Sequence, residues 1–346
     1  MPLSPLAPSS QTPGEVAVLI PCYNEEKTIA AVVRDFRHAL PDARIYVYDN
    51  NSTDATREEA RKAGAIVRRE TTQGKGWVVR RMFADIEADY YVLVDGDDTY
   101  DASIAPAMLA TVQDENLAML VGRRIHESSG AYRPGHVLGN KLFTASVAGL
   151  FGRSFTDILS GYRVFSRAFV KSFPVFSGGF EVETELTVHA LTLGLPISEI
   201  ATTYKERPAG SSSKLNTYRD GVRILWMIFN LFKNEKPLSF FAILGVLCLV
   251  LSALLAYPIV VTFLETGLVP RFPTAILATG LALYALIMFA CGLILDTVTK
   301  GRREMKLLSY LNTSQRAQSM GQPIAALLPA NPFESARTER SLPSVP

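Results

Sequence analysis

Two long stretches without a single charged residue limit what this chain can fold into more than any other feature of its sequence. They span residues 238–264 and 272–295, and each exceeds the roughly 20 apolar residues that a bilayer-spanning helix needs. Buried helices of a large soluble core are the alternative, but core helices rarely run this far without one charge. Only residues 265–271 separate the stretches, so the sequence predicts a transmembrane helical hairpin within residues 237–299.

Basic residues lie on one side of this predicted hairpin. The link between the stretches holds only Arg271, whereas the outer flanks carry Lys233, Lys236, Lys300, Arg302, Arg303 and Lys306. The positive-inside rule therefore predicts an integral membrane protein whose N-terminal region and C-terminus both lie in the cytoplasm.

Residues 215–236 precede the hairpin and place apolar residues at helical spacing, among them Val222, Trp226 and Phe229, beside a flank of basic residues. This pattern predicts an amphipathic juxtamembrane helix in the membrane interface. An ordinary helix packed on the domain core is the alternative. Residues 1–14 are expected to form a disordered tail, and residues 15–214 a globular domain. Residues 300–346 are expected to form a cytoplasmic basic segment followed by a disordered tail.

Charge and cysteine content exclude some functions. A net charge of +2 over 346 residues does not indicate a nucleic-acid-binding protein. The three cysteines show no CxxC or Cys/His spacing, so neither a disulfide framework nor a structural zinc site is expected. A reducing compartment fits this pattern.

Within the globular region, strand-like and helix-like patterns alternate. The predicted strands are 16–20, 44–48, 65–67 and 90–94, and the predicted helices are 25–40, 54–63 and 76–88. This order predicts an α/β fold with a mostly parallel sheet and helices on both faces. Ligands bind such sheets at the carboxyl ends of the strands.

Asp95 and Asp97 follow the last of these strands, with Gly96 between them. Two carboxylates two residues apart can face one ligand, and the glycine leaves room for close approach. Hard oxygen ligands of this kind suit Mg²⁺ or Mn²⁺ bridging a diphosphate. Aspartate pairs also occur in plain turns, but the position after a buried strand favours a metal site.

Three further segments carry polar groups suited to a nucleotide. In DNNSTD (49–54), Asp and Asn can bind a base or ribose, or form a turn and a helix N-cap. In PCYNEE (21–26), Tyr23 can stack on a base, although Asn and Glu also suit a helix start. In QGKG (73–76), Lys75 at a helix N-terminus can hold a phosphate, the alternative being a glycine turn with a solvated lysine.

These segments, in this order and at similar separations, resemble the signature of the family 2 glycosyltransferases. LSGYRVF (159–165), GFEVE (179–183) and RPAGSSSK (207–214) are similar to the polyprenyl-phosphate branch, which includes dolichol-phosphate mannose synthases and bacterial glucosyl or aminoarabinosyl carriers. The resemblance implies a glycosyltransferase A fold, a Rossmann-like mixed sheet followed by interfacial helices and the hairpin. It also implies inversion at the sugar carbon and location in a bacterial inner membrane.

The resemblance further implies site residues by position. The donor pocket would comprise Pro21, Tyr23, Glu25, Asp49, Asn51 and Asp95, and the metal would be held by Asp95 and Asp97. The lipid phosphate would meet Arg123, Arg133 and His136, and a mobile acceptor loop would carry Arg207, Ser213 and Lys214. Two positions depart from the family pattern, because Asn50 and His136 stand where Asp and Arg are expected.

The implied mechanism follows from charge. A lipid phosphate is already an anion near neutral pH, so it can attack without a strong general base, and the enzyme must align it and stabilise the departing diphosphate. Asp97, with the metal, and Lys75 are expected to do the latter, and Arg123 and Arg133 to orient the acceptor. Glu183 and Glu185 are expected either to contact sugar hydroxyls or the closing loop, or to be plain helix-surface carboxylates.

The expected product is therefore a polyprenyl-phosphate-sugar, from an undecaprenyl or dolichyl phosphate. A UDP-sugar is the preferred donor, with GDP-mannose as the alternative, and the hairpin resemblance implies a homotetramer. A processive polysaccharide synthase is a competing interpretation, but it would need more spans and a Gln-x-x-Arg-Trp motif that the sequence lacks. A membrane-bound nucleotide-sugar sensor without catalysis is another, and turnover by purified protein separates it.

Overall fold

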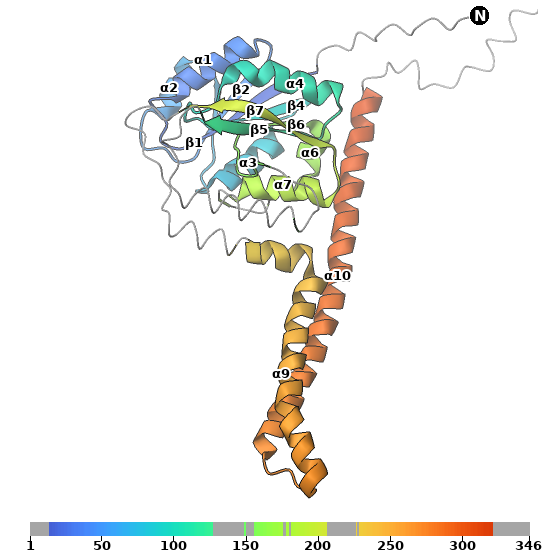
Figure 1. Ribbon diagram of the computed structural model, residues 1–346. Helices are drawn as coiled ribbons and strands as arrows, with labels where there is room; N and C mark the ends of the chain where they lie inside the picture. The colour runs from blue at the N-terminus through green and yellow to red at the C-terminus, as the bar shows by residue number, and fades with distance from the viewer. Residues whose placement is uncertain are drawn as a thin grey trace, which may run out of the picture.

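The computed structural model shows a globular α/β domain joined to a long two-helix stalk (Figure 1). Its described residues are 14–126, 149, 156–175, 178–179, 181–205, 226 and 228–320. Five predicted acceptor-side residues lie outside them, namely Arg133, His136, Arg207, Ser213 and Lys214.

Seven strands of the described chain form one mixed sheet in the order β3-β2-β1-β4-β6-β5-β7. The strands are β1 (Val16–Cys22), β2 (Arg44–Asp49), β3 (Ile66–Arg69), β4 (Tyr90–Leu93), β5 (Met119–His126), β6 (Arg163–Ser166) and β7 (Ile197–Tyr204). Only β6 runs antiparallel to its neighbours β4 and β5, whereas the other strand pairs are parallel. The predicted Rossmann-like mixed sheet is confirmed.

Helices cover both faces of the sheet, as the alternating pattern predicts. The domain helices are α1 (Ile29–Ala39), α2 (Thr56–Lys62), α3 (Lys75–Asp85), the 3-10 turn η1 (Ala102–Ile104), α4 (Ala105–Asp114), α6 (Arg167–Ser172) and α7 (Val182–Thr192). Successive residues of β1 point to opposite faces, so Leu19 joins a core with α3, α6 and α7, while Ile20 joins one with α1 and α4. Burial on both faces explains the continuous apolar runs of these strands.

The two uncharged stretches lie in α9 (Pro237–Thr266) and α10 (Phe272–Met320), which pack side by side as a hairpin. Small residues permit the close approach, since a Cβ at Gly245 would lie 3.0 Å from the Phe289 ring. Across the pair, Ser252 donates a hydrogen bond to the Ala278 carbonyl at 2.6 Å.

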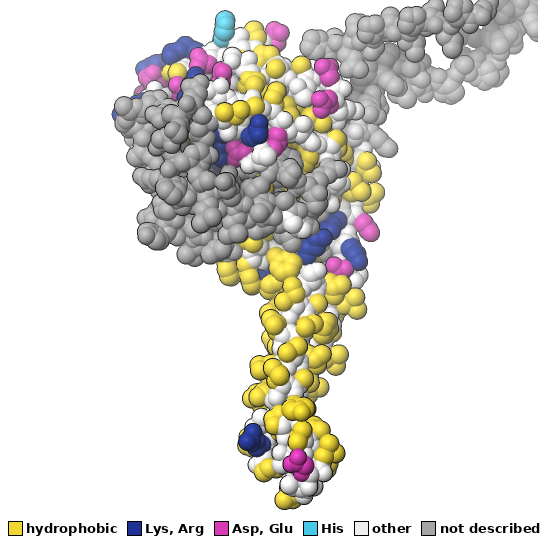
Figure 2. Space-filling model, in the orientation of Figure 1, with side chains coloured by type: hydrophobic (Ala, Val, Ile, Leu, Met, Phe, Trp, Pro, Cys, Tyr) yellow, Lys and Arg dark blue, Asp and Glu magenta, His cyan; other side chains and the backbone are white. Residues whose placement is uncertain are grey.

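Hydrophobic side chains cover the outside of this hairpin (Figure 2). Both helices are long and apolar enough to cross a membrane. Only 11% and 17% of an apolar 18-residue segment of each helix is buried. The alternative of two helices buried in a soluble core is therefore wrong for this structure.

The helix α10 continues well beyond the second apolar stretch to Met320, so the first part of the region 300–346, predicted as a basic segment with a disordered tail, is helical. The basic segment contains strong helix formers such as Lys, Arg, Glu, Leu and Met, which extend a helix already begun in the hairpin. Packing also holds this extension, because Tyr310 lies against the domain core.

Residues 228–235, within the predicted juxtamembrane helix, are helical. Ile228 and Leu231 pack against the domain core, whereas Trp226 and Phe229 are 63% and 44% exposed and stack on each other. The interfacial helix and the helix packed on the domain core, predicted as alternatives, thus correspond to two faces of one helix. One face packs on the domain, and the other presents aromatic side chains outward.

Candidate active site

Acidic side chains predicted from three separate motifs converge at the carboxyl ends of β1, β2 and β4. Cys22, the last residue of β1, lies at their centre and is 3% exposed. Burial raises the pKa of its thiol, and the nearby carboxylates of Glu25, Asp49, Asp95 and Asp97 raise it further. A convergence of negative charge at the end of a sheet is suited to binding a cation and the diphosphate that the cation would bridge.

The loop after β4 leaves no room for a side chain at Gly96. A Cβ at Gly96 would lie 2.6 Å from the Cys22 sulfur, and the Gly96 carbonyl accepts a hydrogen bond from Thr28 Oγ1 at 2.7 Å. Asp97 is buried, and its Oδ1 accepts from Thr99 Oγ1 at 2.6 Å. The Asp95–Asp97 pair is therefore held in a defined geometry rather than in a loose turn.

Lys75, at the start of α3, joins this loop to α7. Its ammonium is ion-paired with Asp95 and lies 2.5 Å from Glu183 Oε1. Burial alone would lower the pKa of Lys75, but the two carboxylates outweigh it and hold the pKa well above its usual value. Lys75, whose side chain is 10% exposed, is thus a protonated cation beside the aspartate pair, and its solvated alternative is wrong.

Glu183 is buried, at 4% exposure, so its interpretation as a helix-surface carboxylate is wrong. Glu185 lies two residues further along the same helix and is half-buried. The sequence did not predict that Glu183 faces Lys75, because 108 residues separate them, and the signal that could have found it is the GFEVE motif itself.

Asn50, the departure from the family pattern, has a structural task. Its amide nitrogen donates to the carbonyls of Glu70 at 3.0 Å and Thr72 at 2.8 Å, and its Oδ1 accepts from the Gly74 backbone at 2.7 Å. An aspartate could not donate these two bonds. Asn50 therefore fixes the loop that delivers Lys75.

Asp49 and Asn51 flank Asn50 at the end of β2. Asp49 is fully buried and accepts from the Ser52 backbone at 3.2 Å, so it organises the turn. Asn51 adopts a left-handed backbone with φ of 65° and donates to the Thr71 carbonyl at 2.8 Å. The predicted turn is present, but α2 begins after Ala55 without a side-chain cap. The predicted contact of Asp49 and Asn51 with a base or ribose stays a prediction.

The loop after β1 carries the other predicted donor residues. Pro21 and Glu25 are half-buried, and Tyr23 is 36% exposed at the surface. The backbone of Glu25 donates to Thr56 Oγ1 at 2.8 Å, and Asn24 Oδ1 accepts from the Thr53 backbone at 2.9 Å. These bonds join the loops after β1 and β2 into one rim.

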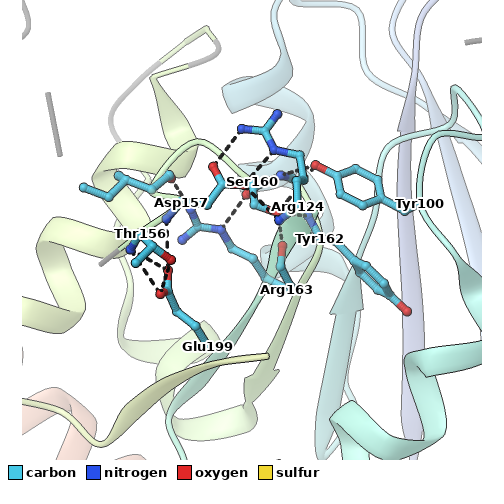
Figure 3. Close-up of polar contacts among 11 residues, drawn as sticks. Tyr100, Arg124, Thr156, Asp157, Ser160, Tyr162, Arg163 and Glu199 are labelled. Carbon is cyan, nitrogen blue, oxygen red and sulfur yellow. Dashed lines mark hydrogen bonds and ion pairs between the residues drawn. The ribbon is translucent and has the colours of Figure 1, made fainter. Parts of the chain in front are cut away.

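A polar network that sequence reasoning missed lies next to Asp95, and Figure 3 shows its members Tyr100, Arg124, Asp157 and Ser160. Gly161 presses on Asp95 so closely that any Cβ would overlap the carboxylate. The backbone of Gly161 donates to the Tyr100 hydroxyl at 2.9 Å, and Ser160 Oγ donates to the Gly122 carbonyl at 2.6 Å. Ser160 and Gly161 belong to the LSGYRVF motif, whose individual residues had no predicted role.

The network continues to Arg124 and Asp157, which form a bidentate ion pair with two N–O distances of 2.7 Å. Burial alone would raise the pKa of Asp157, but Arg124 holds it below its usual value. The Arg124 guanidinium also lies 5.4 Å from the ring centre of Tyr204, which contacts Tyr100 edge-on. This brace links β5 and β7 to the loop after β4.

Arg123 precedes Arg124 in β5, opposite Ala201 of β7, and is half-buried. Successive strand residues point to opposite faces, so the two arginines diverge. Arg124 is the structural member of the pair, and the predicted acceptor role of Arg123 stays a prediction.

The carboxylate oxygens of Asp95 and Asp97 are ligands that fit a divalent metal such as Mg²⁺ or Mn²⁺. In the described ranges no group of three or more His, Cys, Asp or Glu side chains is arranged to hold an ion by itself. Two aspartates that share an ion with diphosphate oxygens form the usual site for such hard cations, which rarely use an all-protein cage.

Comparison with known proteins agrees with this arrangement. Residues 17–173 match the family described as glycosyl transferase family 2. The chain is 38% identical over 236 residues to glycosyltransferase AglJ of Haloferax volcanii, covering 68% of this chain and 77% of that one. It is 27% identical over 215 residues to the undecaprenyl-phosphate mannosyltransferase of Micrococcus luteus, covering 57% and 86%.

A solved structure shares the fold. The glucosyl-3-phosphoglycerate synthase of Mycobacterium tuberculosis, in complex with Mn²⁺ and UDP-glucose, superposes with a TM-score of 0.52 at 23% identity, covering 64% of this chain and 79% of that one. At this identity the likeness supports the glycosyltransferase A architecture alone.

Proposed function

This chain belongs to glycosyltransferase family 2, and we propose that it transfers a sugar, with inversion, from a nucleotide-sugar to a polyprenyl phosphate at the cytoplasmic membrane surface. The observation that carries the proposal is Lys75, ion-paired with Asp95 and only 10% exposed in its side chain, beside the Asp95–Asp97 pair after β4. The relative named as an undecaprenyl-phosphate mannosyltransferase supports the acceptor class.

Donor binding falls to the rim formed by the loops after β1 and β2. Tyr23 offers an exposed ring for stacking on the base, while Asp49 and Asn51 lie where a ribose and base would enter. Pro21 and Glu25 complete the pocket. The proposed donor is a UDP-sugar, the ligand class in the complex of the mycobacterial synthase, and GDP-mannose is the alternative.

Asp95 and Asp97 would hold Mg²⁺ or Mn²⁺, which supplies charge neutralisation for the donor diphosphate when bound. Lys75, which is ion-paired with Asp95, adds a second, fixed positive charge next to the proposed metal. Because its pKa is raised by its carboxylate neighbours, Lys75 stays protonated and stabilises the departing diphosphate without acting as an acid.

The acceptor phosphate needs orientation rather than deprotonation. Arg123 would contact it from β5, together with Arg133 and His136, and Arg207, Ser213 and Lys214 would belong to an acceptor loop; these five companions lie outside the described residues. Their bidentate or charge-assisted hydrogen bonds would align one phosphate oxygen with the sugar carbon, opposite the leaving group. A single displacement of this kind inverts the configuration.

The hairpin α9–α10 would span the membrane and bring the domain to the lipid. The basic flanks support a cytoplasmic location of the domain and both termini, and the exposed Trp226 and Phe229 suit the bilayer interface. The hairpin also offers a surface for assembly, and a tetramer is the proposed oligomer.

The test uses the full chain, purified and reconstituted, with undecaprenyl phosphate, Mn²⁺ and a panel of labelled nucleotide-sugars. We expect one donor to give a labelled product that extracts into organic solvent. Donor binding without lipid-linked product from any member of the panel would instead indicate the sensor alternative.

A further inference from the structure

We propose that Glu235 and Arg303 form a clasp that fixes the height of the catalytic domain above the membrane, which makes them positioning residues for the lipid acceptor. The inference rests on the proposed function, because it concerns an acceptor whose phosphate stays at the bilayer surface. It assigns a role in the reaction to residues far from the aspartate pair.

Glu235 joins three parts of the chain. Arg303 of α10 donates from Nη2 to the Glu235 backbone carbonyl at 2.6 Å and to its Oε2 at 3.1 Å. Thr192, the last residue of α7, donates from Oγ1 to the same carboxylate at 3.2 Å. Since Glu235 lies just before α9, which begins at Pro237, one side chain links the domain to both helices of the hairpin.

One face of α10 turns toward the domain along this stretch. Thr299 donates to the Asn234 carbonyl at 3.4 Å, four residues before Arg303, and Tyr310 packs on the domain core seven residues after it. Lys306 lies on the same face, where burial lowers its pKa. Positions 299, 303, 306 and 310 follow the period of a helix, so they form one continuous face of α10 that contacts the domain and the start of the hairpin.

The clasp lies where the apolar part of the hairpin ends. Asp296 is the first charged residue after the second apolar stretch, and Arg303 follows it by about 10 Å along the helix axis at 1.5 Å per residue. Basic side chains gather at this level, where the hairpin meets the domain (Figure 2). The pair is shielded, with side-chain exposures of 17% for Glu235 and 32% for Arg303.

Height matters because the acceptor cannot leave the bilayer. Its phosphate is confined to a thin layer, and the reacting atoms must come within a few ångströms in the correct orientation. A domain that tilted freely on its hairpin would satisfy this condition only part of the time. A soluble acceptor, by contrast, diffuses to the site whatever the orientation of the domain.

The experiment compares Glu235→Ala and Arg303→Ala with wild type, as full chains in lipid nanodiscs, using two acceptors. One is undecaprenyl phosphate in the bilayer, and the other is a short, water-soluble prenyl phosphate. We expect kcat/KM for the bilayer acceptor to fall on the order of tenfold while that for the soluble acceptor stays unchanged. Lys300→Ala is the matched control, because Lys300 is 70% exposed and pairs with Asp296 within α10.

A second measurement reports height without activity. A fluorophore incorporated at position 62, an exposed site on α2, transfers energy to a dye in the bilayer. The clasp variants should change or broaden this transfer, Lys300→Ala should not, and the double variant should be no worse than either single one.

An equal loss with both acceptors, or wild-type behaviour of the clasp variants in both measurements, would overturn the proposal. If wild type glycosylates no polyprenyl phosphate, the proposed function fails instead, and the energy transfer still decides whether the clasp holds the domain.

Discussion

The Lys75 ammonium lies 2.5 Å from Glu183 Oε1 and is also ion-paired with Asp95, so one lysine connects the loop after β4 to α7. This contact relates two motifs that lie far apart in the sequence. It also places a positive charge beside the carboxylates on which the proposed function depends.

Replacement of this lysine tests its role. Lys75→Met keeps the length of the side chain but leaves Asp95 and Glu183 without their cation, so we expect turnover to fall on the order of 100-fold or more. The free energy of unfolding should fall by about 3 kcal/mol, because buried charges lose their partner. Steady-state kinetics and denaturant unfolding measure both. Glu183→Gln, which retains the Lys75–Asp95 pair, should have the smaller effect, and wild-type turnover in Lys75→Met would exclude the assigned role.

The aspartate pair makes a distinct prediction. Asp97→Ala should abolish transfer and leave the protein folded, and Asp97→Asn should do the same while retaining an acceptor for Thr99. Isothermal titration should show weaker Mn²⁺ binding in both variants. Asp98→Asn is the matched control, since Asp98 has a left-handed φ of 57° that asparagine also tolerates. Normal turnover in Asp97→Asn would remove the metal assignment.

Gly161→Ala tests the packing behind Asp95. The added methyl group would overlap the Asp95 carboxylate, so we expect a loss of turnover on the order of tenfold or more from misplacement at the site. Gly301→Ala makes the same chemical change in α10 where a Cβ meets nothing within 4 Å, and it should leave activity intact. Equal activity of the two variants would show that Gly161 does not set the position of Asp95.

His189 gives a prediction about pH. Burial lowers its pKa to about 3, and it packs edge-on against Phe169 and Phe173. Between that value and the ordinary pKa of about 6.5, the unfolded chain binds a proton that the folded chain does not, so stability falls as pH drops. We expect about 1 kcal/mol lost from pH 6.5 to 5.5 in wild type, and less in His189→Phe. Denaturant unfolding in detergent at several pH values measures the difference, and parallel curves would contradict it.

Much of the fold could be predicted because its signals are local. The strands and helices predicted within residues 16–94 are all present, with ends shifted by a few residues. For example, the helix predicted from residue 25 begins at Ile29, because a turn in which the Thr28 backbone donates to the Glu25 carbonyl comes first. The hairpin was equally clear from the absence of charge.

The rest depends on contacts between distant residues. The antiparallel strand β6 fits between β4 and β5, and its register pairs Val164 with Leu120, which no local period reveals. The motifs identified Asp95, Asp97 and Lys75 as candidates, but the brace of Tyr100, Gly161 and Arg124 behind them depends on tertiary packing. The extension of α10 was missed because its basic composition resembles a solvated tail until its contacts with the domain are known.

The most direct test of the central claim is mass spectrometry of both products after reaction with undecaprenyl phosphate. The proposed chemistry predicts a lipid that carries one phosphate and one sugar, released together with the intact nucleoside diphosphate, and formed only when Mn²⁺ or Mg²⁺ is present. A diphosphate-linked lipid with release of nucleoside monophosphate, or undiminished product after removal of the metal by a chelator, would contradict it.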